Sequence, residues 1–338
     1  MNPQRVDLIW NITRLCPWHC TICCVDADPL NVHRQEGGPR ELDYREKLSV
    51  LDNLRGFVPK IDISGGDPLA VPDALPLIEE CSKRFGADGV TLTATGTTLR
   101  HLAPEFAARH IGEINITYDM PDTTENDTRP RGYSSGNLSM SKRFLDVGLR
   151  LRAECPLTTR NVAPRTVQRI FLDLHDAGIQ TLLITRMFPV GRGDSDAGLI
   201  PSADQYRLAL SSLRELEADR KLPKIRLQCA LRFFDDSMHG SNPCDLVRLS
   251  LGIMPDGTLL TSPWAYGRRG QPLDDVWVLG NLALSPLHEI LASEKAQYYR
   301  EHLDDNFGHC KVFSWLHSKR AESLERVFDT SDPLLIPP

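Results

Sequence analysis

Short apolar runs alternate with helical patterns over the N-terminal part of the chain. The runs are rich in Ile, Leu, Val or Thr and too short for independent helices, so they predict strands over residues 8–13, 60–64, 90–95, 113–119, 149–155 and 181–187. Between these runs, apolar residues recur at helical spacing, as in Leu75, Ile78, Cys81 and Phe85. Strands that alternate with helices predict an α/β fold with a parallel sheet or barrel.

This rhythm ends with a long helical pattern over residues 201–223. From residue 225 onward the sequence carries cysteines, turns and only short strand signals. We therefore expect a core over residues 1–220, a small α+β extension over 221–330 and a loose tail over 331–338.

Composition narrows the class of protein. Of the 338 residues, 41% are hydrophobic and 25% charged, which is typical of a folded globular chain. The net charge of −6 argues against a nucleic-acid partner, which would need a basic face. No apolar run approaches the ~18 residues needed to cross a bilayer, and charged residues interrupt the N-terminus, so we expect a cytoplasmic protein without a membrane partner.

The nine cysteines are odd in number and favour metal or cluster ligation over disulfides. Three of them, Cys16, Cys20 and Cys23, form a C-x3-C-x2-C pattern directly after the first predicted strand. Three thiolates on one loop can bind three irons of a cubane cluster and leave the fourth iron open. The alternatives are free thiols or a structural zinc site, for which Cys24 or His19 would supply the fourth ligand.

With this loop the sequence resembles the radical S-adenosylmethionine (SAM) superfamily, over about residues 6–193. Ile22 stands directly before the third cysteine, and in the family the apolar residue at this position packs on the adenine. Gly65, Gly66 and Asp67 resemble the family's Gly-Gly-Glu-Pro motif, with Asp in place of Glu. In the family, the backbone of this motif meets the methionine amino group. The alternative for the two glycines is an ordinary strand-to-helix turn.

Further positions extend the resemblance. Thr117 and Asp119 fall where the family places ribose-binding residues, although Asp119 could equally cap a helix or form an ion pair. The segment 189–192 resembles one found in members with a C-terminal extension. The resemblance implies a partial (β/α)6 barrel similar to a TIM barrel, a [4Fe-4S] cluster and SAM as cofactors, and flavodoxin or ferredoxin as electron donor.

The C-terminal segment resembles a degenerate SPASM or twitch extension, which in the family carries an auxiliary iron–sulfur cluster. Only Cys229, Cys244 and Cys310 remain, so a four-thiolate cluster cannot form from this segment alone. Three alternatives stay open: a cluster whose fourth site is open or filled by His309 or His317, a zinc site, or an extension that has lost its metal.

The resemblance implies reductive cleavage of SAM to a 5′-deoxyadenosyl radical and hydrogen abstraction from a substrate. An incomplete auxiliary cluster favours a redox-neutral outcome, and the cytosylglucuronic acid decarboxylase type fits best. We therefore expect decarboxylation of a sugar-acid nucleoside in antibiotic biosynthesis. An anionic sugar or nucleoside would be bound by arginines near the mouth of the barrel: Arg152, Arg160, Arg186, Arg192, Arg232, Arg268 and Arg269.

Other outcomes remain open at this point. One is a dehydrogenase of an aminocyclitol or sugar alcohol. Another is a radical epimerase in which Cys155, at the end of the fifth predicted strand, donates a hydrogen atom; the alternative is a core cysteine, as for Cys81. A cluster-bearing accessory protein without turnover is the alternative to an enzyme.

Overall fold

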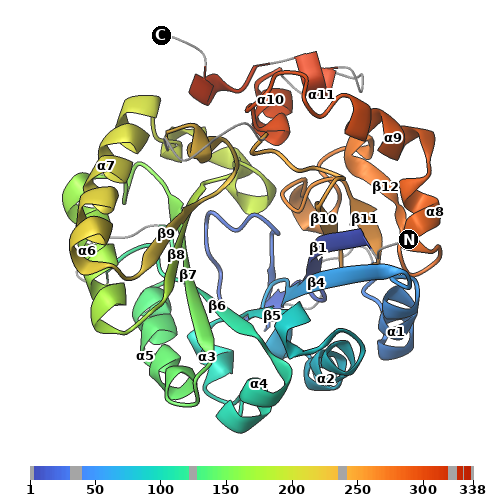
Figure 1. Ribbon diagram of the computed structural model, residues 1–338, viewed down its shortest axis with the longest axis horizontal. Helices are drawn as coiled ribbons and strands as arrows, with labels where there is room; N and C mark the ends of the chain where they lie inside the picture. The colour runs from blue at the N-terminus through green and yellow to red at the C-terminus, as the bar shows by residue number, and fades with distance from the viewer. Residues whose placement is uncertain are drawn as a thin grey trace.

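One continuous sheet forms the wall of an open barrel (Figure 1). The computed structural model describes residues 4–30, 40–121, 128–234, 242–318, 326–329 and 331–335. The sheet has the order β12-β11-β10-β1-β4-β5-β6-β7-β8-β9, and every pair from β10 to β9 is parallel. The six predicted strands are confirmed as β1 (Gln4–Asn11), β4 (Phe57–Ser64), β5 (Val90–Thr93), β6 (Glu113–Thr117), β7 (Arg150–Leu157) and β8 (Thr181–Arg186).

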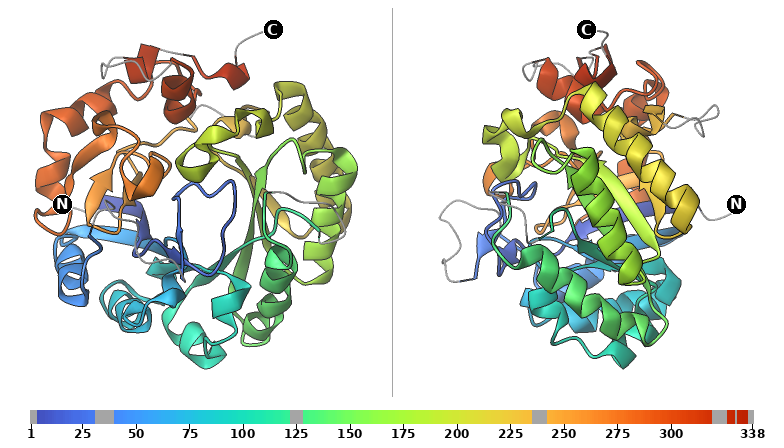
Figure 2. Two further views of the ribbon diagram at one scale, coloured as in Figure 1. Left: turned by 180° about the vertical axis from the view of Figure 1, so that it is seen from behind. Right: turned by 90° about the vertical axis from the view of Figure 1, so that its left-hand side faces the viewer.

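Helices cover the outside of this wall, as the views in Figures 1 and 2 agree. They are α1 (Tyr44–Asp52), α2 (Ala74–Phe85), α3 (Gly96–Leu99), α4 (Pro104–His110), α5 (Tyr133–Leu145), α6 (Pro164–Asp176) and α7 (Ala203–Arg220). In α2 the predicted apolar residues Ile78 and Cys81 are buried, whereas Leu75 of the same pattern is exposed. The alternation of strands and helices therefore gives the α/β partial barrel that the sequence predicts.

Strand residues alternate between this helix-covered core and the barrel interior. In β4, Ile61 and Ile63 are fully buried, whereas Asp62 and Ser64 line an interior pocket. In a strand, successive side chains point to opposite faces. The barrel interior therefore carries polar side chains from the strands that are available to a ligand.

The C-terminal segment continues the same sheet on both edges. Strand β9 (Lys224–Leu227) extends it beyond β8, and β10 (Ser250–Ile253) pairs with β1 on the other side. Two antiparallel strands follow, β11 (Thr258–Leu260) and β12 (Val278–Asn281). Helices α8 (Leu287–Leu291), α9 (Glu294–Glu301), α10 (Lys311–His317) and α11 (Arg326–Asp329) complete the ring in Figure 1.

The expected loose tail is partly wrong. Within residues 331–335, Asp332 is fully buried and Leu334 nearly so, because Asp332 forms an ion pair with the barrel wall. Residues 336–338 of the expected tail lie outside the described residues. Among the described helices, none combines the length and apolar character needed to span a membrane.

Candidate functional site

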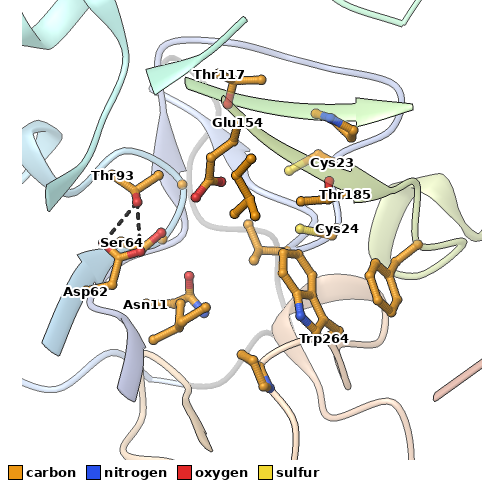
Figure 3. Close-up of a pocket in the computed structure, with 18 of the residues that line it drawn as sticks. Asn11, Cys23, Cys24, Asp62, Ser64, Thr93, Thr117, Glu154, Thr185 and Trp264 are labelled. Carbon is orange, nitrogen blue, oxygen red and sulfur yellow. Dashed lines mark hydrogen bonds between the residues drawn. The ribbon is translucent and has the colours of Figure 1, made fainter. Parts of the chain in front are cut away.

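A cavity of about 390 Å³ occupies the barrel interior and includes the carboxyl ends of the strands among its lining. Its upper wall is the loop after β1, which crosses the middle of the ring in Figure 1, and its sides are polar residues from β1, β4, β5, β6, β7 and β8 (Figure 3). Binding sites of parallel α/β folds lie at this end of the sheet. The cavity is therefore the candidate active site.

All three cysteines of the predicted cluster loop, Cys16, Cys20 and Cys23, line this cavity. Burial raises the pKa values of the Cys16 and Cys20 thiols, and the charges of the neighbouring sulfurs raise them further. Cys24 also lines the cavity, whereas His19 is exposed and does not line it. His19 therefore does not complete a zinc set with the three thiols.

Segments distant in sequence hold this loop in place. Arg14 forms a buried ion pair with Asp28, at 3.0 Å, across the short strands β2 (Leu15–Cys16) and β3 (Asp28–Pro29). Arg192 donates to the Cys20 carbonyl at 2.9 Å, and its backbone N–H donates to the Cys23 carbonyl at 2.9 Å. The predicted segment 189–192 thus supports the cysteine loop from the end of β8.

The two glycines after β4 pack directly against the same loop. A Cβ on Gly65 would lie 2.3 Å from the Thr13 carbonyl, and one on Gly66 would lie 2.4 Å from that of Leu15. Gly65 also has a φ of 140°, which L side chains rarely adopt. Both glycines line the cavity, so their first role is to let β4 approach the cysteine loop.

The side chain of Asp67 points away from the cavity, contrary to its prediction as a cofactor-binding residue. It is fully buried and accepts hydrogen bonds from the Thr95 hydroxyl at 2.6 Å and from that of Thr98 at 2.7 Å. These bonds tie the end of β4 to the start of α3. The carboxylate therefore acts on the turn and not on a ligand.

Of the other predicted cofactor residues, Ile22 and Thr117 line the cavity and Asp119 does not. Asp119 is buried and pairs with Arg129 at 2.8 Å, which confirms the ion-pair alternative. Arg129 lines the cavity beside Cys20, where its charge lowers the thiol pKa against the larger effect of burial. Sequence analysis missed Arg129, which lies ten residues beyond its partner.

Residues 10–204 match the radical SAM superfamily, and this match covers more than half of the chain. The chain belongs to this superfamily. It is 26% identical over 300 residues to the PqqA peptide cyclase of Streptomyces rochei, covering 87% of this chain and 77% of that protein. It is also 28% identical over 223 residues to the GTP 3′,8-cyclase of Rhizobium meliloti, covering 64% of this chain and 60% of that protein.

Among solved structures, the fold is similar to Streptococcus suis SuiB bound to its precursor peptide SuiA. The TM-score is 0.73 at 13% identity, covering 99% of this chain and 76% of that one. Native anSMEcpe with bound AdoMet gives 0.67 at 13% identity, covering 97% and 93%. These likenesses confirm the radical SAM barrel with its C-terminal extension.

The cofactors of a radical SAM enzyme are a [4Fe-4S] cluster and SAM, and the donor set of this chain fits them. Buried thiols become ligands when a cation stabilises the thiolate. Among the described residues, no three His, Cys, Asp or Glu side chains converge on a single metal ion. In a cubane each thiolate binds a different iron, so the three thiols need not share one metal position. When bound, the pair supplies a 5′-deoxyadenosyl radical to this cavity.

Cys155 lies on the wrong face of β7 for a hydrogen donor. It is fully buried in the helix-covered core, together with Leu151 and Ala153. Its neighbours Glu154 and Pro156 face the cavity instead. The predicted donor role is therefore corrected, and the alternative of a core cysteine holds.

The barrel interior also carries a charged network that sequence analysis missed. The Thr93 hydroxyl donates to the Asp62 carboxylate, whose two oxygens lie 2.8 and 2.9 Å from it (Figure 3). Arg152 pairs with Glu154 at 3.0 Å and with Glu113 at 3.3 Å. Burial, and then the charge of Glu154, raise the pKa of Asp62 to about 7. This network could have been predicted from the sequence, because charged residues alternate with buried apolar ones in β4 and β7.

The arginines expected at the mouth do not present a free cationic site. Only Arg152 and Arg186 of the predicted set line the cavity. Arg152 pairs with two carboxylates, and Arg186 forms a buried ion pair with Asp332 at 2.6 Å. Arg192 pairs with Asp26 at 3.1 Å and supports the cysteine loop. The prediction of an anionic substrate therefore loses the support that it took from these arginines.

The remaining cysteine group converges, although its members are far apart in sequence. Cys229 shares hydrogen bonds with Cys244 and Cys310, which raise the pKa of Cys229 and lower that of Cys244. His309 accepts the Asp332 backbone N–H at Nδ1, and His317 is exposed. Neither histidine completes a four-ligand zinc set here, so the group stands as three buried or half-buried thiols.

Proposed function

We propose that this radical SAM enzyme removes a hydrogen atom from a substrate held in the barrel interior. The cluster would be held by Cys16, Cys20 and Cys23, and SAM by the wall that contains Ile22, Gly65, Gly66 and Thr117. The observation that carries the proposal is that this wall and the polar interior belong to one cavity. A cofactor and a second molecule can therefore meet there.

The residues of this site have separable roles. Arg129 holds positive charge beside Cys20 and favours the thiolate needed for ligation. Arg192 and Gly191 keep the loop against the end of β8; a Cβ on Gly191 would lie 2.3 Å from the Cys24 carbonyl. Trp264 stacks on Phe188, with ring centroids 4.8 Å apart, and the two rings give the cavity an apolar side.

The test is anaerobic reconstitution with iron and sulfide, followed by incubation with dithionite and SAM. We expect the wild-type protein to release 5′-deoxyadenosine, which chromatography with mass spectrometry measures. Protein reconstituted without iron is the control. An iron-loaded protein that binds SAM but releases no 5′-deoxyadenosine would support the accessory-protein alternative instead.

The convergent thiols favour an oxidative outcome over the expected decarboxylation. Removal of a hydrogen atom leaves a substrate radical, and oxidation must then release a proton and pass one electron to an acceptor. Cys229, Cys244 and Cys310 are the residues that could hold such an acceptor. We therefore place the dehydrogenase ahead of a sugar-acid decarboxylase, for which neither the arginines nor the relatives give support.

Iron analysis distinguishes the two outcomes. With an acceptor cluster, reconstituted protein should hold about eight irons per chain, against about four without it. The triple change of the three cysteines to Ala should then lower the iron content by half and leave uncoupled 5′-deoxyadenosine release intact. A wild-type protein with about four irons would return the redox-neutral outcome to first place.

A further inference from the structure

We propose that Asp62 and Glu154 form a recognition site for a protonated primary amine of the substrate, inside the barrel and below the cofactor wall. The inference rests on the proposed function, because it places the substrate in the same cavity. It replaces the anionic substrate class with a cationic one.

The two carboxylates reach the cavity from different strands. Asp62 lies on β4 and Glu154 on β7, and β5 and β6 lie between these two strands in the sheet. Both residues line the cavity (Figure 3). Asp62 is fixed by Thr93 and by Asn115, whose Nδ2 lies 3.3 Å from the carboxylate. Glu154 is fixed by Arg152 at 3.0 Å. Both acceptors are therefore held in place before a ligand arrives.

The charges around this site do not balance. In the part of the chain that the structure describes, Asp62, Glu113 and Glu154 face two cations, Lys60 and Arg152. The other charged groups at the cavity are paired elsewhere. Asp7 of β1 pairs with Arg5, Arg129 pairs with Asp119, and Arg186 of β8 pairs with Asp332. Within the described residues, one carboxyl is thus left without a counter-charge. Asp62 meets this by keeping a proton below its raised pKa of about 7, and an ammonium group would take the place of that proton.

Four residues that line the cavity each have a buried polar atom without a hydrogen-bond partner among the described residues. Two of these atoms are the Nε of Arg152 and the Oε1 of Gln228, and the other two are the Nε1 of Trp18 and the Nε of Arg186. Buried polar atoms normally have hydrogen-bond partners, and a polar ligand would supply partners for donors and for acceptors. A donor such as a hydroxyl or ammonium suits Gln228, and an acceptor oxygen suits Arg152. The site therefore fits an amine that also carries oxygen functions.

Two sources of such an amine are an amino sugar or aminocyclitol and a lysine side chain of a peptide. The probes are 2-deoxystreptamine, its di-N-acetyl derivative and glucuronate, together with N-acetyl-lysine methylamide and its Nε-acetylated form. Calorimetry on reconstituted, SAM-saturated protein measures their affinities. The two amines decide between the sources, and the acetylated forms measure the contribution of the positive charge.

We expect at least one amine to bind about tenfold or more tightly than its acetylated form, since hydrogen bonds to charged groups are the stronger ones. Asp62→Asn and Glu154→Gln should remove most of this preference and leave SAM affinity unchanged. The matched control is Asp7→Asn, which removes a carboxylate that lines the same cavity but pairs with Arg5 outside this network. It should keep the preference.

Several results would overturn the inference. One is tighter binding of glucuronate than of either amine, and another is equal binding of amines and acetylated forms by the wild-type protein, which requires no variant. A third is a loss of SAM affinity in Asp62→Asn and Glu154→Gln, which would assign the carboxylates to the cofactor. Release of 5′-deoxyadenosine by the wild type without any probe tests the proposed function separately.

Discussion

Arg186 and Asp332 form a buried two-point ion pair, with N–O distances of 2.6 and 3.1 Å, across 146 residues of sequence. Asp332 also accepts the backbone N–H of Cys310 at 3.2 Å. The guanidinium of Arg186 lies 3.4 Å from the ring centroid of Phe313 in α10. A residue that lines the cavity is thereby joined to the segment that carries the third C-terminal thiol.

Loss of this pair should destabilise the protein strongly. Asp332→Asn keeps the size of the side chain but leaves the Arg186 charge buried without its partner, so we expect a loss of about 3–5 kcal/mol in the free energy of unfolding. Urea denaturation of the metal-free protein measures it. The control is Asp204→Asn, because Asp204 and Arg207 form an exposed pair; its loss should stay below about 1 kcal/mol. Equal losses would contradict the prediction.

Removal of any one cluster thiol should abolish both iron retention and SAM cleavage. Cys16→Ala, Cys20→Ala and Cys23→Ala each delete a ligand from a loop that other contacts hold in place, so the fold should remain. Absorbance of the reconstituted cluster and 5′-deoxyadenosine release measure the effect. Cys81→Ala is the control, since Cys81 is buried in α2 away from the cavity. Retained cluster absorbance in any of the three variants would refute its assignment as a ligand.

Gly66→Ala should displace the cysteine loop. Its new Cβ would lie 2.4 and 2.5 Å from the carbonyl oxygens of Leu15 and Arg14. We expect about 1–3 kcal/mol of lost stability from this crowding, together with weaker iron retention. Gly136→Ala is the control, because a Cβ at this position in α5 meets nothing within 4 Å. A variant that loses SAM affinity but neither stability nor iron would show that Gly66 serves the ligand alone.

The fold could be predicted from sequence because each strand carries its own pattern. The starts of β1 and β4 were missed, since Arg5 and Asp7 interrupt the apolar run and Gln4 is held only by pairing with Phe57. The extension was expected as a separate region because its strands are short. Their place in the sheet depends on pairing with β1 and β8, which no local pattern encodes.

The site was predictable where a motif or an alternation marks it. The cysteine loop is marked by the spacing of its cysteines. In β7, alternate residues share a face, so Cys155 lies with Leu151 and Ala153 and opposite Glu154, and the orientation of Cys155 could have been inferred. The partners of Asp119 and Arg186 could not, because they lie 10 and 146 residues away and no local pattern links each pair. The same holds for the convergence of the C-terminal thiols.

The stability of the metal-free protein should depend on pH through Asp62. Burial and Glu154 raise the pKa of this carboxyl from 3.8 to about 7, so between these values the folded state holds a proton that the unfolded state has lost. The stabilisation from this proton is complete below pH about 4 and disappears as the pH rises through 7. Asp62→Asn cannot ionise and lacks this dependence, while the other carboxyls titrate alike in both proteins.

The measurement is therefore the difference in unfolding free energy, wild type minus Asp62→Asn, at several pH values from 4.5 to 7.5. We expect this difference to fall steadily over that range and to level off above it. Addition of a bound amine probe should reduce the slope, because a positive charge beside Asp62 lowers its pKa in the folded state. A difference that stays constant with pH would mean that Asp62 is ionised in the folded protein throughout, and that Lys60 and Arg152 already balance its charge.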